Sequence, residues 1–203
     1  ILYADPMPEW TQQPLLSALL PESFALDYVE ARDQAALFRL LETADYLLTG
    51  WSAGKIDSKF LAWAPRLRFI QIMGVGYENV DIPATEAAGI PVANTSGLNA
   101  AAVGEHVAMF LLAFWKNFAF ANDAMHRGQW PYARLQQMGV GEMAGKTVGI
   151  LGYGKVGAQI AKRLYAFDVR LMYHDLCRNP ADETAYAMRY ADKEALLGEA
   201  DAV

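Results

Sequence analysis

Short apolar runs alternate with amphipathic segments over the first half of the chain. Apolar side chains recur at helical spacing after Asp33, after Asp57 and between Ile82 and Ala88, where Gly89 is suited to end a helix. Strands joined by such helices predict a parallel sheet covered on both faces. The runs that predict strands are Ile1–Ala4, Phe24–Val29, Tyr46–Thr49, Phe69–Met73 and Pro91–Asn94.

A long helix is predicted from Asn99 to about Phe120, and it is apolar nearly all round. Small residues on one side, from Ala100 to Ala108, favour close packing. We expect the rest of its surface to be covered by its own domain and by another subunit. Residues 128–145 are rich in glycine and predict an irregular loop.

The most informative stretch follows, and it reads as strand, glycine turn, helix and strand. Thr147–Leu151 predicts the first strand, and the second ends in His174-Asp175. This is the order of a dinucleotide-binding fingerprint, in which the first glycine allows a tight turn, the second lets a pyrophosphate approach the backbone and the third permits close helix packing. The turn reads Gly152-Tyr153-Gly154-Lys155-Val156-Gly157.

Asp175 follows Gly157 by 18 residues, close to the spacing of roughly 20 expected for the carboxylate that binds the adenosine ribose. Such a carboxylate accepts hydrogen bonds from the ribose hydroxyls and repels a 2′-phosphate, which favours NAD over NADP. Arg178 lies close by in the sequence and softens that preference. The alternative is a glycine turn that binds no nucleotide, but the striped helix and the terminal Asp175 argue against it.

Beyond the fingerprint, Ala187–Tyr190 predicts a third strand, and Asp192 is expected to cap a helix through Leu197. The last three residues, 201–203, resemble the start of a fourth strand. A nucleotide-binding domain of this type normally continues into a second half. We therefore expect the chain to be a fragment of a longer protein, with its Rossmann domain truncated at Val203, or its ordered part to stop there.

Composition excludes several classes of protein. The chain has 203 residues, is 54% hydrophobic and carries a net charge of −6 with scattered Lys and Arg, which argues against disorder and nucleic-acid binding. The single cysteine, Cys177, and the lack of a signal-peptide pattern at Ile1 favour a cytoplasmic protein. Residues 100–120 include Glu105, His106 and Lys116, too polar for a membrane span. We expect no metal site.

The chain resembles the D-isomer-specific 2-hydroxyacid dehydrogenases, which include glyoxylate/hydroxypyruvate reductase and the D-lactate and phosphoglycerate dehydrogenases. The resemblance covers essentially all 203 residues, and Glu78 replaces a more usual Asp. The blocks that carry it, besides the fingerprint, are Pro65–Gln71, Gly74–Asp81, Gly89–Asn94, Val103–Glu105, Arg127–Trp130 and Gly145–Ile150.

The resemblance implies a flavodoxin-like substrate-binding domain over residues 1–97 and a Rossmann NAD-binding domain over 98–203, with a homodimer formed through the 99–120 helix. It implies that the backbone amides of Val75 and Gly76 hold the substrate carboxylate. Val103 would pack near the nicotinamide, and Lys155 and Val156 would line the pyrophosphate. Trp51 and Ser52, which follow the third predicted strand, would line the wall of the substrate pocket. Each of these roles has a structural alternative. Val103 could be a core valine, the turn at Val75 could be an ordinary strand-to-helix turn, and Trp51 could shield a loop from solvent.

The family's reaction is hydride transfer between the nicotinamide and a small 2-oxo or D-2-hydroxy acid, with an Arg, a Glu and a His in the catalytic roles. All three are expected beyond Val203, so no residue of this chain is assigned as catalytic. His106, His126 and His174 are not candidates for the catalytic acid or base. Alternatives are an NAD-sensing, non-catalytic binding protein related to corepressors and a formate or phosphonate dehydrogenase. Phosphite enzymes place a Lys where Val75 stands, which argues against them.

Overall fold

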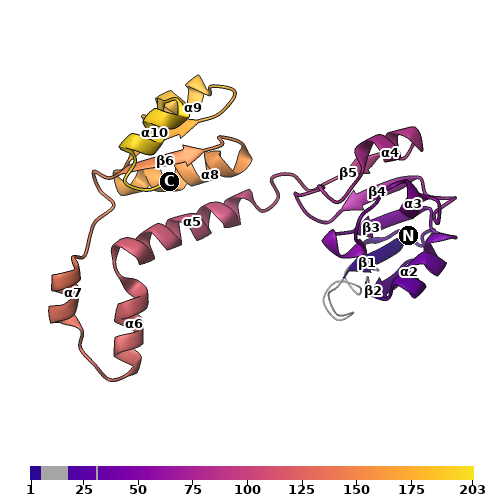
Figure 1. The fold of residues 1–203 in the computed structure, drawn as a ribbon, viewed down its shortest axis with the longest axis horizontal. Coiled ribbons are helices and arrows are strands. Elements are labelled where there is room, and N and C mark those ends of the chain that lie inside the picture. The colour runs from indigo at the N-terminus through magenta and orange to yellow at the C-terminus, as the bar shows by residue number, and fades with distance from the viewer. Residues whose placement is uncertain (6–17, 31) are drawn as a thin grey trace. The chain divides into compact units, whose positions relative to one another are not determined.

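The computed structural model of the chain describes residues 1–5, 18–30 and 32–203. They divide into two compact units, Ile1–Ser96 and Gly97–Val203, called unit 1 and unit 2 below (Figure 1). Both units are built from parallel strands and helices. The predicted α/β fold class is confirmed.

Unit 1 contains a five-stranded sheet in the order β2-β1-β3-β4-β5, in which every neighbouring pair is parallel. This is the strand order of flavodoxin-like doubly wound sheets. The apolar runs predicted as strands all contribute, although three of the strands are shorter than expected. The strands are β1 (Leu2–Asp5), β2 (Asp27–Glu30), β3 (Tyr46–Thr49), β4 (Phe69–Ile72) and β5 (Val92–Ala93).

The helices of unit 1 begin at aspartates that cap their free backbone amides, and the sequence predicts two of these, Asp33 and Asp57. The Asp33 carboxylate accepts from the N–H of Ala36 at 3.0 Å, and Asp57 and Asp81 cap the next two helices in the same way. Their apolar faces pack on the sheet in one core, with Leu37 and Leu41 fully buried. The elements are α2 (Gln34–Leu41), the short 3₁₀ turn η1 (Trp51–Ala53), α3 (Ser58–Leu61) and α4 (Ile82–Ala87).

Unit 2 contains a second parallel sheet, with β6 (Thr147–Leu151), β7 (Arg170–His174) and β8 (Arg189–Tyr190) in that order. Ala202 pairs in parallel with Val148 on the other side of β6, and its carbonyl accepts from the N–H of Gly149 at 2.8 Å. The order β8-β7-β6-Ala202 corresponds to 3-2-1-4, the first half of a Rossmann sheet.

Helix α5 (Ala100–Trp115) packs along α8 (Lys155–Leu164), and the packing relies on small residues. Gly104 is buried, and a Cβ placed on it would lie 3.0 Å from the carbonyl oxygen of Gln159 on α8. The prediction that the small residues of this helix allow close packing is therefore confirmed. The remaining elements of this part are η2 (Tyr165–Phe167), α9 (Pro180–Ala185) and α10 (Lys193–Glu199).

Two sequence predictions in unit 2 are wrong. The helix predicted to continue to Phe120 breaks at Asn117, which has a left-handed backbone (φ 49°), and α6 (Phe118–His126) follows. Asparagine tolerates this conformation, and the Asn117 side chain donates to the Gly139 carbonyl at 2.8 Å. At the other end, Asn99 stands at the N-cap position of α5 and makes no side-chain hydrogen bond to the helix start.

The second error concerns residues 128–145, predicted as an irregular loop, because they include helix α7 (Tyr132–Met138). Pro131 stands at the start of α7, where a fixed φ and a missing N–H cost nothing. Gly139, with φ 79°, ends it. The glycines that suggested a loop therefore delimit a helix.

Candidate functional site: a dinucleotide cradle

The glycine turn joins β6 to α8 and leaves room above it. Gly152 has φ 92°, which allows the chain to turn sharply after the strand. A Cβ placed on Gly157 would lie 2.5 Å from the carbonyl oxygen of Gly152, so only glycine permits this approach of helix to turn. A Cβ on Gly154 would meet no atom within 4 Å, which leaves open space where a ligand would approach the backbone.

The start of α8 is suited to an anion. Gly154 occupies the N-cap position. Because glycine has no side chain, no capping group of this residue covers the first-turn amides. The helix has ten residues, and its dipole places partial positive charge at this end. A pyrophosphate fits such a helix start.

Asp175 follows the carboxyl end of β7 and faces the glycine turn. Its carboxylate accepts a short hydrogen bond from the backbone N–H of Tyr153 and a second, of 3.3 Å, from the N–H of Cys177. These donors, Tyr153 first, hold the pKa of Asp175 below its usual value. The glycine turn, predicted to bind the pyrophosphate, and the Asp175 carboxylate, predicted to bind the adenosine ribose, therefore lie side by side.

Tyr153 contributes to this turn through its backbone, because its side chain is buried beneath it. The phenol donates to Asp182 on α9 at 3.0 Å, and its ring lies 4.5 Å from that of Tyr173. Burial, and then the Asp182 carboxylate, raise the pKa of Tyr153 above its ordinary value. The tyrosine thus anchors the turn to the core of unit 2.

The other residues predicted to bind the cofactor lie on α8 and α5. Lys155 opens α8, and its side chain lies against Gly97, where an added Cβ would be 2.3 Å from the lysine Cδ. Val156 follows it in the first turn of α8. Val103 is half-buried on α5, directly before Gly104 in the contact with α8.

In unit 1, the residues predicted to hold a carboxylate form an exposed turn after β4. The turn is fixed from below, because the Asn94 side chain donates to the Val75 carbonyl at 2.6 Å and the N–H of Thr95 donates to the Gly74 carbonyl at 2.9 Å. A Cβ on Gly76 would lie 3.3 Å from the indole nitrogen of Trp51. The structure therefore brings Val75, Gly76 and Trp51 together.

A hollow of about 370 Å³ lies beside this turn and is lined in part by Asn94. Its other lining residues are mostly apolar: Tyr77, Ile82, Val92 and Ala93. No role for Asn94 follows from the sequence, because an asparagine at a strand end gives no sign of which carbonyl it binds. A second residue without a sequence signal is Glu183, which binds both Arg178 and the buried Tyr173.

None of the three histidines lies in the glycine turn. His106 is exposed on α5 with its ring 4.2 Å from that of Phe110, and His126 is exposed at the end of α6. His174 ends β7, and its Nδ1 lies 3.0 Å from the carbonyl oxygen of Ala191. Within residues 1–5, 18–30 and 32–203, no cluster of three or more acidic, His or Cys side chains is arranged to bind a metal ion.

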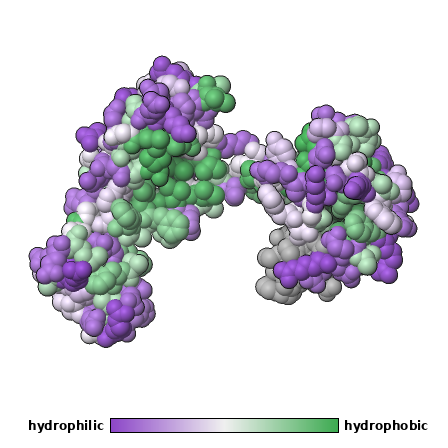
Figure 2. All heavy atoms as spheres, viewed as in Figure 1, coloured by the Kyte–Doolittle hydropathy of each residue, from purple (hydrophilic) through white to green (hydrophobic). Residues whose placement is uncertain are grey.

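Large apolar side chains are exposed on the outer face of α5 and at Phe118, the first residue of α6. Phe114 is 73% exposed, and Phe110, Phe118 and Met109 are at least half exposed. Figure 2 shows hydrophobic residues gathered over this part of unit 2. We call this set the α5 outer face. Among the described helices, none is both long and apolar enough to cross a lipid bilayer.

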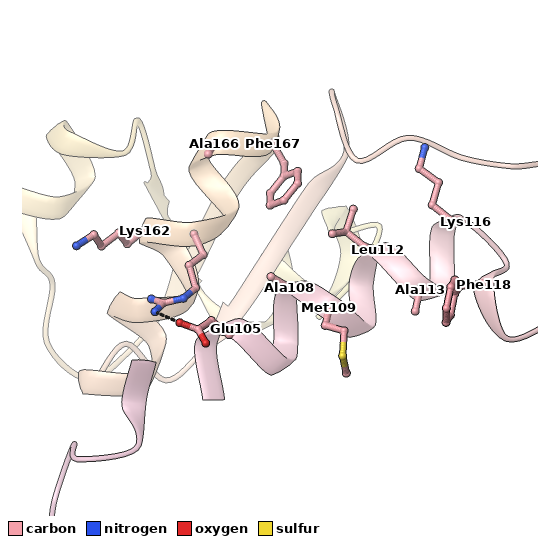
Figure 3. A pocket seen from close by; sticks show the side chains of 11 residues that line it. Glu105, Ala108, Met109, Leu112, Ala113, Lys116, Phe118, Lys162, Ala166 and Phe167 are labelled. Atoms are coloured by element: carbon pink, nitrogen blue, oxygen red, sulfur yellow. Dashed lines mark hydrogen bonds and ion pairs between the residues drawn. The ribbon is translucent and has the colours of Figure 1, made fainter. Parts of the chain in front are cut away.

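A trough of about 740 Å³ runs beside the α5 outer face, between α5 and the end of α8 (Figure 3). Ala108, Leu112 and Phe167 form part of its apolar wall, and Glu105 pairs with Arg163 at 2.9 Å across it. Charged side chains therefore border an apolar floor, an arrangement common at protein interfaces.

Strand, glycine turn, helix start and carboxylate together define unit 2 as a dinucleotide-binding domain of the doubly wound class. The comparison with known families agrees. Residues 108–203 match the model described as D-isomer specific 2-hydroxyacid dehydrogenase, NAD binding domain. The chain belongs to the D-isomer specific 2-hydroxyacid dehydrogenase family, as its sequence blocks predicted, and NAD is its cofactor.

Individual relatives support the same family. The chain is 34% identical over 180 residues to a glyoxylate reductase of Thermofilum pendens, covering 87% of this chain and 52% of the relative. It is 30% identical over 188 residues to a D-3-phosphoglycerate dehydrogenase of Mycobacterium bovis, covering 93% and 35%. The chain thus spans about half the length of the glyoxylate reductase and about a third of the length of the phosphoglycerate dehydrogenase.

Solved structures share the fold. A D-lactate dehydrogenase from Aquifex aeolicus, complexed with NAD and lactic acid, superposes with a TM-score of 0.81 at 20% identity, covering 99% of this chain and 59% of the other. A formate dehydrogenase from Granulicella gives 0.73 at 28% identity, covering 80% and 44%. At these identities the first comparison supports the fold alone.

Proposed function

We propose that the protein carrying this chain is an NAD(H)-dependent oxidoreductase that interconverts a small 2-oxo acid and its D-2-hydroxy acid. The observation that supports this most strongly is the hydrogen bond from the Tyr153 amide to the Asp175 carboxylate, because the carboxylate proposed to bind the ribose then lies beside the turn proposed to bind the pyrophosphate. NADH, when bound, supplies the hydride.

The residues of unit 2 then have separate tasks in cofactor binding. The amides of Gly154, Lys155 and Val156 bind the pyrophosphate, while Gly152 and Gly157 give the turn its shape. Asp175 accepts hydrogen bonds from the adenosine ribose. Val103 packs near the nicotinamide. We assign residues 98–203 to the NAD-binding domain and residues 1–97 to the substrate-binding domain.

For unit 1 we propose that the amides of Val75 and Gly76 bind the substrate carboxylate and that Trp51 walls the pocket. The Gly74–Gly76 turn supports this, because Asn94 engages the Val75 carbonyl and so fixes the peptide that the substrate would meet. The general acid, its partner Glu and the Arg that binds the substrate are proposed to lie outside this sequence.

Assays on the full-length protein test the proposal. We expect NADH-dependent reduction of glyoxylate, hydroxypyruvate or pyruvate, and no turnover by the isolated 203-residue chain. A full-length protein that binds NADH but reduces no 2-oxo acid would instead support the NAD-sensing alternative. Oxidation of formate with NAD⁺ as the sole activity would point to a formate dehydrogenase.

We propose further that the protein is a homodimer and that the α5 outer face forms its interface. The exposure of Phe110 and Phe114 supports this, since large apolar patches on a helix are rarely left in water. The trough beside them offers a matching surface for a second copy. A cytoplasmic location is also proposed, consistent with Cys177, the single cysteine of the sequence, being a free thiol.

A further inference from the structure

Glu183 on α9 is held in place by a buried tyrosine. The Tyr173 hydroxyl donates to the Glu183 carboxylate at 2.7 Å and accepts from the backbone N–H of Asn179 at 2.7 Å. Tyr173 is fully buried in the middle of the unit 2 core. The carboxylate of Glu183 is therefore fixed to the frame of the domain rather than free to follow solvent.

This fixed carboxylate binds Arg178 through two parallel hydrogen bonds. The Arg178 Nε lies 3.1 Å from Glu183 Oε1, and its Nη2 lies 2.6 Å from Oε2. The guanidinium also lies over the Tyr190 ring, 5.2 Å from its centre. The two-point geometry and the stacking hold the arginine in one orientation.

Arg178 lies close to Asp175 in the sequence, so its pairing with Glu183 bears on which nucleotide can bind. It follows Asp175 by three residues, in the segment after β7 where we propose that the adenosine ribose binds. An arginine near that carboxylate is the usual means of binding the 2′-phosphate of NADP. Here the Nε and Nη2 edge of the guanidinium, which would grip a phosphate, is engaged by Glu183.

We propose that Glu183 is a positioning residue for cofactor selection: by engaging Arg178, it keeps that guanidinium from binding a 2′-phosphate and so reinforces the preference for NAD set by Asp175. The inference rests on the proposed cofactor site. Glu183 does not touch the cofactor itself. The hydrogen bonds to Glu183 are the chief cause that raises the pKa of Arg178, which agrees with a strong pairing.

The test is calorimetric titration of NADH and NADPH into the full-length protein and its Glu183→Gln variant. Glutamine keeps an oxygen that accepts from Tyr173 but loses the charge that holds Arg178. We expect NADPH binding to strengthen roughly tenfold or more relative to NADH, about the effect of one added charge-assisted hydrogen bond. NADH affinity should change less than about twofold.

Three further variants identify the cause. In an Arg178→Ala background the gain from Glu183→Gln should vanish, and Arg178→Ala alone should leave the ratio of NADPH to NADH affinity unchanged. Glu194→Gln, which removes one exposed carboxylate from α10, is the control for net charge and should also leave the ratio unchanged. If Glu183→Gln fails to fold, Arg178→Ala still allows the proposal to be refuted, because weaker NADPH binding in that variant would show that Arg178 already contacts the 2′-phosphate.

Several outcomes would overturn the proposal. They are an unchanged ratio in Glu183→Gln, a parallel loss of both nucleotides in that variant, the same gain without Arg178, or weaker NADPH binding in Arg178→Ala alone. A wild-type protein that binds neither nucleotide would instead refute the proposed function, so the two failures are distinguishable.

Discussion

A Cβ atom on Gly157 would lie 2.5 Å from the carbonyl oxygen of Gly152, well inside van der Waals contact. The obstacle is backbone, which cannot rotate away as a flexible side chain would. We predict that Gly157→Ala pushes α8 from the turn, lowers the free energy of unfolding by about 1–3 kcal/mol and weakens NADH binding. Chemical denaturation and NADH titration measure the two effects, and a variant with wild-type stability would contradict the packing argument.

Gly154→Ala is predicted to behave differently, because a Cβ there meets no protein atom and the glycine has a negative φ of −83°. The methyl group would instead occupy the space through which the pyrophosphate approaches the backbone. We expect stability close to wild type but at least about tenfold weaker NADH binding. Unchanged affinity would show that the nucleotide lies elsewhere.

Asp175→Asn should weaken NADH binding by roughly tenfold. It should also reduce the difference in affinity between NADH and NADPH, because the amide no longer repels a 2′-phosphate. The gap is obtained from the two dissociation constants measured in the same buffer. Equal losses for both nucleotides would contradict a role for Asp175 at the ribose.

The pH dependence of NAD⁺ binding follows from the lowered pKa of Asp175. A depressed carboxyl pKa means that the charge is present above the unfolded value of about 3.9 and is lost only as the pH falls through the lower folded value. The Asp175 contribution should therefore be constant from pH 8 to about pH 5. A loss of the difference between wild type and Asp175→Asn within that range would contradict the assignment.

Asn94→Ala removes the side chain that holds the Val75 carbonyl at 2.6 Å. We predict that KM for the 2-oxo acid rises roughly three- to tenfold, the cost of one hydrogen bond, while the dissociation constant of NADH stays the same. Steady-state kinetics and NADH titration on the full-length protein separate the two. An equal effect on both would indicate general damage rather than a role in substrate binding.

Phe114→Glu should dissociate the proposed dimer, because it places a charge in the centre of the α5 outer face. Leu197→Glu is the matched control, since Leu197 is an exposed apolar residue on α10. Sedimentation velocity should show a monomer for the first variant and a dimer for the second and for the wild type. A wild-type monomer would contradict the proposed interface.

Much of the fold could be predicted from the sequence because local signals agree with the tertiary packing. Strands β3 and β6 match their predicted ranges residue for residue, since both are mostly apolar runs with clear ends. Asp33, Asp57 and Asp192 cap helices through contacts only two or three residues away. Such short-range chemistry is visible in a sequence.

The parts that were missed depend on contacts distant in the chain. The apolar pattern of α5 continues into α6, and the break at Asn117 is fixed by Gly139, 22 residues further on. At the site, the fingerprint predicted the positions of Gly152 and Asp175. It gave no sign of Glu183, whose role depends on its contacts with Tyr173 and Arg178.

The most direct test of the account is a crystal structure of the full-length protein with NAD⁺. We predict that the first-turn amides of α8, from Gly154 to Val156, bind the pyrophosphate and that both oxygens of Asp175 lie within hydrogen-bond distance of the adenosine ribose hydroxyls. A nucleotide bound away from the Gly152 turn, or a ribose that makes no contact with Asp175, would contradict it.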